Sequence, residues 1–154
     1  MSIKDITVII TSFKSGEKIK NCLNSIDREC KVLLIENSND PNIKENIEKE
    51  FSNVECILTG ANLGYGKSNN IGLKKVTTKY ALILNPDTYL WEDSISKMVR
   101  FMDGHPDIGV LGPDLKDIHG RSQLPASRFP GLMQQLLEAL FLNFVNQKNE
   151  SAFN

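Results

Sequence analysis

The stretch ITVIITSF, residues 6–13, begins with five consecutive apolar or β-branched residues and then turns polar. Three further runs have the same character: residues 32–35 (VLLI), 54–58 (VECIL) and 80–84 (YALIL). A strand of a sheet that is covered on both faces is apolar at nearly every position, whereas a strand with one wet face alternates. The four runs therefore predict buried strands of a parallel sheet.

Helical spacing separates these runs. Apolar residues recur at three- or four-residue steps within 19–26, 43–51 and 95–102, and a Gly-rich segment leads into a further helix over 66–76. Gly104, with a proline two residues later, is typical of a helix end. The alternation of strand and helix predicts an α/β fold: an open, mainly parallel sheet with helices on both faces.

The pattern changes after residue 106. Residues 108–111 and 115–118 resemble two short strands, and residues 131–146 form one amphipathic helical pattern with an apolar stripe. We expect a main domain over 1–130, followed by this helix and a frayed tail over 131–154. The stripe would pack on its own domain, pair with a second copy, or contact a membrane surface.

Length and composition narrow the class of protein. The chain has 154 residues, enough for one domain with a core, and its formal net charge of −1 offers no basic surface for nucleic acid. Cys22, Cys30 and Cys56 lack metal-site spacing, which favours buried free thiols in a reducing, cytoplasmic setting. We identify no signal peptide and no run of about 20 apolar residues, so we expect a soluble chain, at most peripheral on the inner membrane face.

Polar or Gly-rich segments follow all four predicted strands. The carboxyl ends of parallel strands meet at one edge of an open α/β sheet, and ligands bind there. Because polar or Gly-rich segments occur at four successive strand ends, they together predict a ligand site, which no single segment would predict. The candidate binding residues at these ends are Thr11, Phe13, Glu36, Asn37, Asn62, Gly64, Lys67, Asn69, Asn70, Asn85 and Asp87.

Several of these positions suit nucleotide chemistry. Phe13 offers a face for stacking on a base, and the carboxylate of Glu36 accepts a hydrogen bond from a base N–H. The helix that begins near Gly64 directs its N–H groups toward phosphate. Asp87 follows an apolar strand, where a carboxylate suits a hard divalent cation. The plain structural alternatives are a core position for Phe13, a turn or cap for Glu36, and tight turns for the glycines.

Taken in order, these loops resemble glycosyltransferase family 2, which has the GT-A fold, and especially its rhamnosyltransferase-like members. The resemblance covers about residues 5–130, although we expect the chain to be truncated relative to the full family domain. The matching segments are 8–13 (first strand and turn), 36–38 (ENS, for Asp-Asn-Ser), 62–72 (Asn-x-Gly-aromatic and the following Asn and Gly), 84–87 (LNPD, for the metal motif), 112–113, Gly120 and 128–130.

The resemblance implies a dTDP- or UDP-sugar donor bound through Mg²⁺ or Mn²⁺ on Asp87. It also implies inverting transfer to a glycan or lipid-linked acceptor in surface polysaccharide synthesis. Lys67 would add positive charge at the diphosphate. Three residues depart from the family pattern: Glu36 replaces Asp, Asn85 replaces the first acid of the metal motif, and Asn69 stands where many members carry Arg.

A P-loop is the competing nucleotide-binding interpretation. Residues 61–68 follow a strand, open a helix and end in Gly-Lys-Ser. However, Ala61 stands where the first glycine belongs, and Asn85 and Pro86 separate Asp87 from the strand that a Walker B acid would end. The P-loop also leaves the Glu-Asn-Ser segment without a role, so we rank it second.

The catalytic base of the family has no counterpart in this sequence. Residues 131–154 contain no acid pair like that of the acceptor half, and Asp114 and Asp117 are expected to serve turns. Two function classes therefore stay open. The chain is a glycosyltransferase, or its donor-binding half, or it is a non-catalytic interaction module that retains the fold.

Overall fold

The computed structural model describes residues 3–38, 40–117 and 119–123. The chain forms two compact units, Met1–Leu111 and Gly112–Asn154. The first contains η1 (Ile3–Asp5), β1 (Ile6–Ser12), α1 (Glu17–Asn24), β2 (Lys31–Glu36), α2 (Pro41–Glu50), β3 (Val54–Leu58), α3 (Tyr65–Leu73), β4 (Tyr80–Leu84) and α4 (Ser94–Gly104). The second contains β5 (Leu115–Lys116) and β6 (Ser122–Gln123).

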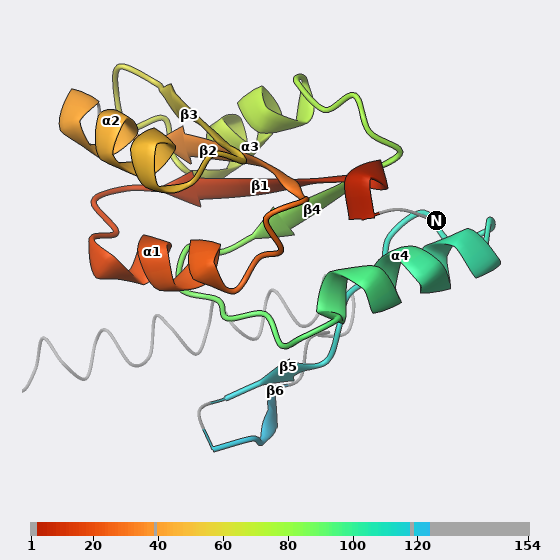
Figure 1. The fold of residues 1–154 in the computed structure, drawn as a ribbon. Helices are drawn as coiled ribbons and strands as arrows, with labels where there is room; N and C mark the ends of the chain where they lie inside the picture. The colour runs from red at the N-terminus through yellow and green to blue at the C-terminus, as the bar shows by residue number, and fades with distance from the viewer. Residues whose placement is uncertain (1–2, 39, 118, 124–154) are drawn as a thin grey trace, which may run out of the picture. The chain divides into compact units, whose positions relative to one another are not determined.

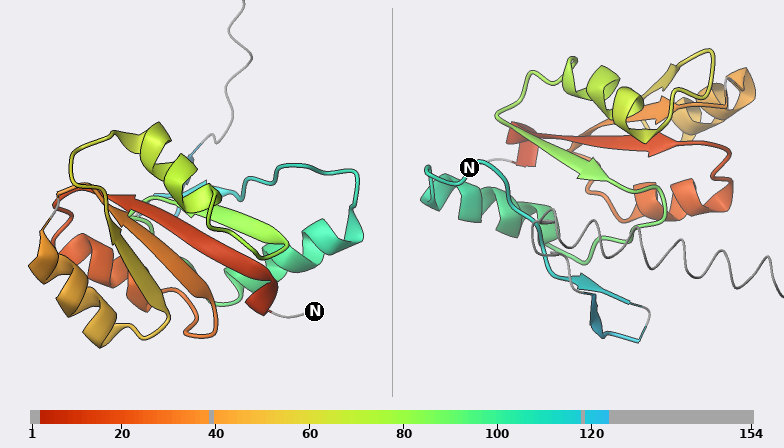
Figure 2. Two further views of the ribbon diagram at one scale, coloured as in Figure 1. Left: turned by 90° about the horizontal axis from the view of Figure 1, so that it is seen from above. Right: turned by 180° about the vertical axis from the view of Figure 1, so that it is seen from behind.

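The first unit is built on a four-stranded sheet of order β3-β2-β1-β4, in which every neighbouring pair is parallel. Figure 2 shows the four arrows pointing the same way. β1 lies inside the sheet, with Ile9 beside Leu33 on β2 and Ile83 on β4, and all of its residues are buried. The predicted open parallel sheet is confirmed and each of the four predicted strands is present, but β4 is not buried throughout as predicted, since Ala81 and Ile83 are exposed.

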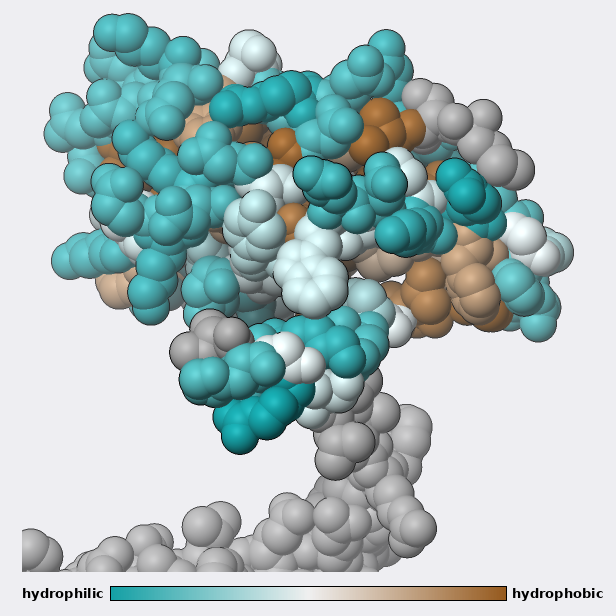
Figure 3. Space-filling view, turned by 60° about the horizontal axis from the view of Figure 1, so that its bottom comes forward, coloured by the Kyte–Doolittle hydropathy of each residue, from teal (hydrophilic) through white to brown (hydrophobic). Residues whose placement is uncertain are grey.

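Helices cover both faces of this sheet, as predicted. One apolar cluster joins Val8 and Ile10 of β1 to side chains of α1, α2 and α4. The intervening residue, Ile9, points to the other face and joins a second cluster against which Ile71 of α3 packs. Figure 1 shows α1 and α3 on opposite sides of the sheet. Hydrophilic residues cover most of the molecular face in Figure 3, and hydrophobic ones gather in separate smaller patches.

Local signals explain where the helices start and stop. Asp40 precedes Pro41, the first residue of α2, and its carboxylate accepts a hydrogen bond from the backbone N–H of Asn42 at 2.9 Å. α4 ends at Gly104, before Pro106, as the sequence predicts. In the described part of the chain, we find no helix with the length and apolar character that a membrane crossing requires.

Gly72 lets α3 approach the sheet closely. A Cβ at this position would lie 2.5 Å from Cγ2 of Ile9, which is fully buried. We expect Gly72→Ala to lower the free energy of unfolding by about 1–2 kcal/mol in urea denaturation, because overpacking outweighs the gain in helix propensity. Gly66→Ala, on the same helix but with open space around the new methyl group, should cost nothing or stabilise slightly. Equal destabilisation by both substitutions would contradict this explanation.

Two expectations for the later residues need correction. Residues 108–111 form no strand: Val110 is 90% exposed, and no strand among the described residues pairs with this segment. Of the strand predicted over 115–118, Leu115–Lys116 forms β5, which pairs antiparallel with β6, Asp117 is outside it, and residue 118 lies outside the described residues. Apolar residues alone do not make a strand when glycine flanks them and no partner is present. The predicted helix at 131–146 and the domain boundary at 130 lie outside the described residues.

Candidate functional site

The loops after the four strands of the first unit leave the same edge of the sheet (Figure 1). β1 is followed in the chain by β2 and β3 on one side, whereas β4 lies on its other side. The direction of the strand order therefore reverses between β1 and β4, the place where open α/β sheets bind ligands. The loop with Phe13 follows β1 at this point, and the loop with Asn85 and Asp87 follows β4.

Glu36 is buried at the end of β2, with only 1% of its surface exposed. The hydroxyl of Ser12 at the end of β1 donates to one carboxylate oxygen, and the backbone N–H of Ser38 donates to the other at 2.7 Å. Burial of a carboxylate is tolerated when both oxygens receive hydrogen bonds. Glu36 therefore ties the ends of β1 and β2 together, and any ligand contact would add to these bonds.

Asn37, also buried, holds the loop between β3 and α3. Its backbone N–H donates to the carbonyl of Ser12 at 2.9 Å. Its side-chain oxygen accepts hydrogen bonds from the hydroxyls of Thr59 at 3.0 Å and Ser68 at 2.9 Å. Sequence reasoning overlooked Ser12, Thr59 and Ser68, although hydroxyl residues at strand ends and on a buried helix face are a signal for such bonds.

The N-terminal part of α3 is anchored on β1. The Thr11 hydroxyl donates to the side-chain oxygen of Asn69 at 2.9 Å, and both residues are buried. Gly64 caps the helix with φ of 76°, a value that favours glycine, and its N–H donates to Asn62 at 3.1 Å. Asn62 and Gly64 thus shape the turn that precedes the first N–H groups of α3.

The predicted site residues separate into two groups. Thr11, Glu36, Asn37 and Asn69 are buried and bonded to protein atoms, and they hold the loops in place. The remainder are exposed at the surface: Phe13, Asn62, Gly64, Lys67, Asn70, Asn85 and Asp87. Phe13 is 48% exposed, so it is not a core residue, and its ring carries the Lys14 ammonium 5.6 Å from the centroid. The second group is the one with surface available to a ligand.

Asp87 lies in the loop between β4 and α4, next to a buried thiol. Burial, with a further contribution from the carboxylate of Asp87, raises the pKa of Cys22 to about 11. The Cys22 thiol donates to the carbonyl of Asn85 at 3.6 Å. Cys22, Cys30 and Cys56 are all buried and free, as the sequence predicts.

Asp87 fits a divalent cation only as a single-carboxylate site. No group of three His, Cys, Asp or Glu side chains suited to a metal ion occurs among residues 3–38, 40–117 and 119–123. Mg²⁺ and related cations are held by one or two carboxylates when substrate phosphates supply further oxygens. An exposed carboxylate two residues after Asn85, in the loop that follows β4, is compatible with that arrangement.

The two candidate bases in the second unit are occupied in its hairpin. Asp117 accepts hydrogen bonds from the backbone N–H groups of Arg121 and His119, and from the Arg121 guanidinium at 2.8 Å. Asp114 lies 2.7 Å from the Lys116 ammonium. These contacts lower the pKa of both carboxyls and make them weaker bases, so the turn role predicted for them is supported.

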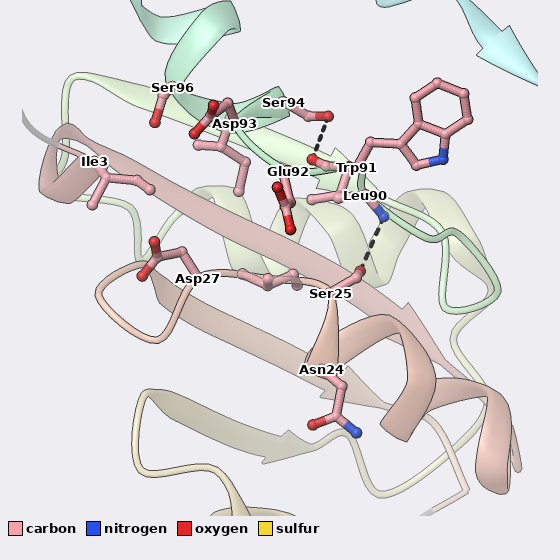
Figure 4. Close-up of a pocket in the computed structure, with 12 residues that line it drawn as sticks. Ile3, Asn24, Ser25, Asp27, Leu90, Trp91, Glu92, Asp93, Ser94 and Ser96 are labelled. Atoms are coloured by element: carbon pink, nitrogen blue, oxygen red, sulfur yellow. Dashed lines mark hydrogen bonds between the residues drawn. The ribbon is translucent and has the colours of Figure 1, made fainter.

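One cavity in the described residues lies away from this edge. It has a volume of about 320 Å³ and is lined by Ile3, by residues 24–27 and by residues 90–96. Ile3 precedes β1 and residues 24–27 follow α1, so this cavity is near the amino ends of the strands. Figure 4 shows the Trp91 ring pointing away from it. We therefore assign the ligand site by strand topology and not by cavity size.

Sequence comparison identifies the family. Residues 7–151 match the family model described as glycosyl transferase family 2. The chain is 24% identical over 150 residues to an N-acetylglucosaminyl-diphospho-decaprenol L-rhamnosyltransferase of Mycobacterium tuberculosis, covering 88% of this chain and 49% of that protein. It is 26% identical over 132 residues to the low-salt glycan biosynthesis hexosyltransferase Agl10 of Haloferax volcanii, covering 83% and 41%. The chain thus spans about half the length of the curated relatives it matches.

Solved structures show the same fold. TarS (residues 1–349) of S. aureus aligns with a TM-score of 0.57 at 22% identity, over 66% of this chain and 33% of that one. The mannosyltransferase PcManGT from Pyrobaculum calidifontis, solved in complex with GDP-Man and Mn²⁺, aligns with a TM-score of 0.58 at 14% identity, over 64% and 32%. With the parallel sheet, the loops at its carboxyl edge and the match over residues 7–151, the chain belongs to glycosyltransferase family 2.

Proposed function

We propose that this chain is the donor-binding half of a glycosyltransferase, and that it binds a nucleoside-diphosphate sugar with Mg²⁺ or Mn²⁺. The observation that carries the proposal is an exposed carboxylate, Asp87, at the carboxyl end of β4, where the strand order reverses in a family 2 fold. The donor we favour is a dTDP- or UDP-sugar. The proposed reaction is inverting transfer to a glycan or lipid-linked acceptor in surface polysaccharide synthesis.

The exposed residues define the proposed donor contacts. The half-exposed ring of Phe13 is available to stack on the base. The N-terminus of α3 and the exposed Lys67 supply N–H groups and positive charge for the diphosphate. The exposed amides of Asn70 and Asn85 offer further hydrogen bonds. Glu36 is buried and receives two protein donors, so we place it with the residues that hold the loops and not with the donor contacts.

Asp87, with Asn85 beside it, would hold the divalent cation. Such a cation, when bound, offsets the negative charge of a nucleoside diphosphate and makes it a better leaving group. Within the chain, the buried group of Thr11, Glu36, Asn37 and Asn69 holds the ends of β1 and β2 and the N-terminal part of α3 in place.

We also propose that the protein is located in the cytoplasm. Residues 131–146 would contact the inner membrane surface or a second copy of the chain. The alternative from a different class is a non-catalytic interaction module, in which this apolar stripe is the main functional surface.

Calorimetric titration of the wild-type chain tests the donor proposal. UDP, dTDP, GDP and ATP are titrated with and without Mn²⁺. We expect at least one nucleoside diphosphate to bind, and to bind about tenfold or more tightly when Mn²⁺ is present. ATP binding without nucleoside-diphosphate binding would favour the P-loop, and no binding at all would favour the interaction module.

A further inference from the structure

The loop between β4 and α4, residues 85–93, has no regular secondary structure, yet it carries Asp87. Within this loop, the Thr88 N–H donates to the Asn85 carbonyl at 3.2 Å. Hydrogen bonds join this loop to the C-terminal end of α1 and to Ser25, the residue that follows the helix. The Cys22 thiol donates to the Asn85 carbonyl, the Thr88 backbone also bonds Cys22, and the Leu90 N–H donates to the Ser25 hydroxyl at 3.0 Å.

Ser25 makes the strongest of these connections, because a thiol is a weak donor and a weak acceptor. Its hydroxyl accepts from the Leu90 N–H and donates to the carbonyl of Cys22 at 2.7 Å, near the C-terminus of α1 (Figure 4 for the Leu90 bond). One hydroxyl thus satisfies a backbone donor of the loop and a carbonyl of the helix end. Alanine provides neither bond, whereas threonine provides both.

Leu90 adds a packing contact at the same point. Its side chain is partly buried and packs against the main apolar cluster, between Tyr89 and Trp91, which are both largely exposed. The backbone of the loop is therefore fixed at Leu90, three residues after Asp87. A rigid attachment this close restricts the positions that the Asp87 carboxylate can adopt.

We propose that Ser25 is a positioning residue for the donor site: its hydroxyl, by binding the Leu90 N–H, holds the loop so that Asp87 is placed for the cation. The inference rests on the proposed function. Outer residues that orient a metal ligand typically change metal affinity 10- to 100-fold when removed. Ser25 is not one of the proposed donor contacts, and its hydroxyl bonds Cys22 and Leu90, so the proposed effect is exerted through the loop.

The test compares Ser25→Ala with Ser25→Thr and with Thr78→Val. The Thr78 hydroxyl also joins two elements, since it lies 2.8 Å from that of Thr7 and bonds the Tyr80 carbonyl at the amino end of β4. Two quantities are measured in each variant: hydrogen exchange of the Leu90 amide, and the affinity of Mn²⁺ for the complex with the nucleoside diphosphate that the wild type binds. A melting curve reports the stability of each variant.

For Ser25→Ala we expect Leu90 exchange about tenfold faster and Mn²⁺ affinity about tenfold weaker, with metal-free nucleotide binding unchanged. Ser25→Thr should retain wild-type values. Thr78→Val should lower the melting temperature by a similar few degrees without changing either quantity. Should Ser25→Ala not fold, Ser25→Cys replaces it with the same expectation.

The outcomes separate the inference from the proposed function. Unchanged Leu90 exchange, or faster exchange with unchanged Mn²⁺ affinity, overturns the positioning role while nucleotide binding stands. A wild-type chain that shows no metal-dependent nucleotide binding overturns both. An equal loss of Mn²⁺ affinity in Thr78→Val would also overturn the inference, because the effect would then follow general destabilisation.

Discussion

Replacing Asp87 by alanine is expected to weaken Mn²⁺ binding to the nucleotide complex by about 100-fold, or about 2.7 kcal/mol. Asp87 is the one carboxylate of the proposed cation site, since Asn85 stands where a second acid would be and no three-residue metal cluster occurs in the described residues. With a single charged ligand, no neighbouring acid compensates for its loss. Asp87→Asn should retain part of the affinity, because an amide oxygen still coordinates a hard cation.

The matched control for this prediction is Glu92→Gln. Glu92 is an exposed acid of the same loop, so this substitution makes the same change in net charge as Asp87→Asn. We expect it to leave Mn²⁺-dependent nucleotide binding unaltered in the calorimetric titration. Melting curves should show little change for either variant, because both side chains are exposed. If Asp87→Ala still binds the nucleotide in a fully Mn²⁺-dependent manner, the cation lies elsewhere.

Glu36→Ala is expected to lower the free energy of unfolding by about 3 kcal/mol. The substitution removes two hydrogen bonds to a buried carboxylate and leaves the Ser12 hydroxyl and the Ser38 N–H without their partner. Bonds to charged groups contribute about 1.5–3 kcal/mol each, and unpaired buried donors add a cost. Urea denaturation, with the slope checked for two-state behaviour, measures the difference.

Two variants sharpen this prediction. Glu36→Gln should be intermediate, because the Ser12 hydroxyl can rotate to accept from the new amide group. Glu55→Ala, on the neighbouring strand β3, removes an exposed carboxylate whose ion pairs with Lys31 and Lys75 are 3.6 Å long. We expect that change to cost less than about 1 kcal/mol. A small effect of Glu36→Ala would mean that the carboxylate is not the link between β1 and β2.

The elements of the first unit were predictable because their signals are local. A run of apolar and β-branched residues such as 6–10 is stable as a strand when other elements cover both faces of its sheet. The start of α2 at Asp40 and Pro41, and the end of α4 at Gly104, follow from capping chemistry within a few residues. The prediction of a strand at 108–111 was wrong because a strand also needs a pairing partner, and that partner comes from a distant part of the chain.

The sequence by itself determined that this protein has a parallel α/β sheet, and that polar loops with Phe13 and Asp87 follow its strands. Only the tertiary structure decided which of those polar residues remain available to a ligand. Glu36 and Asp87 are both acids near a strand end. Glu36 is buried and accepts a hydrogen bond from Ser12, 24 residues away, whereas Asp87 is exposed. The contact of Ser25 with Leu90 likewise joins residues 65 positions apart. Hydrophobic periodicity and helix capping depend on residues within one or two helical turns of each other. Burial and long-range hydrogen bonds depend on which strands and helices become neighbours in the folded chain.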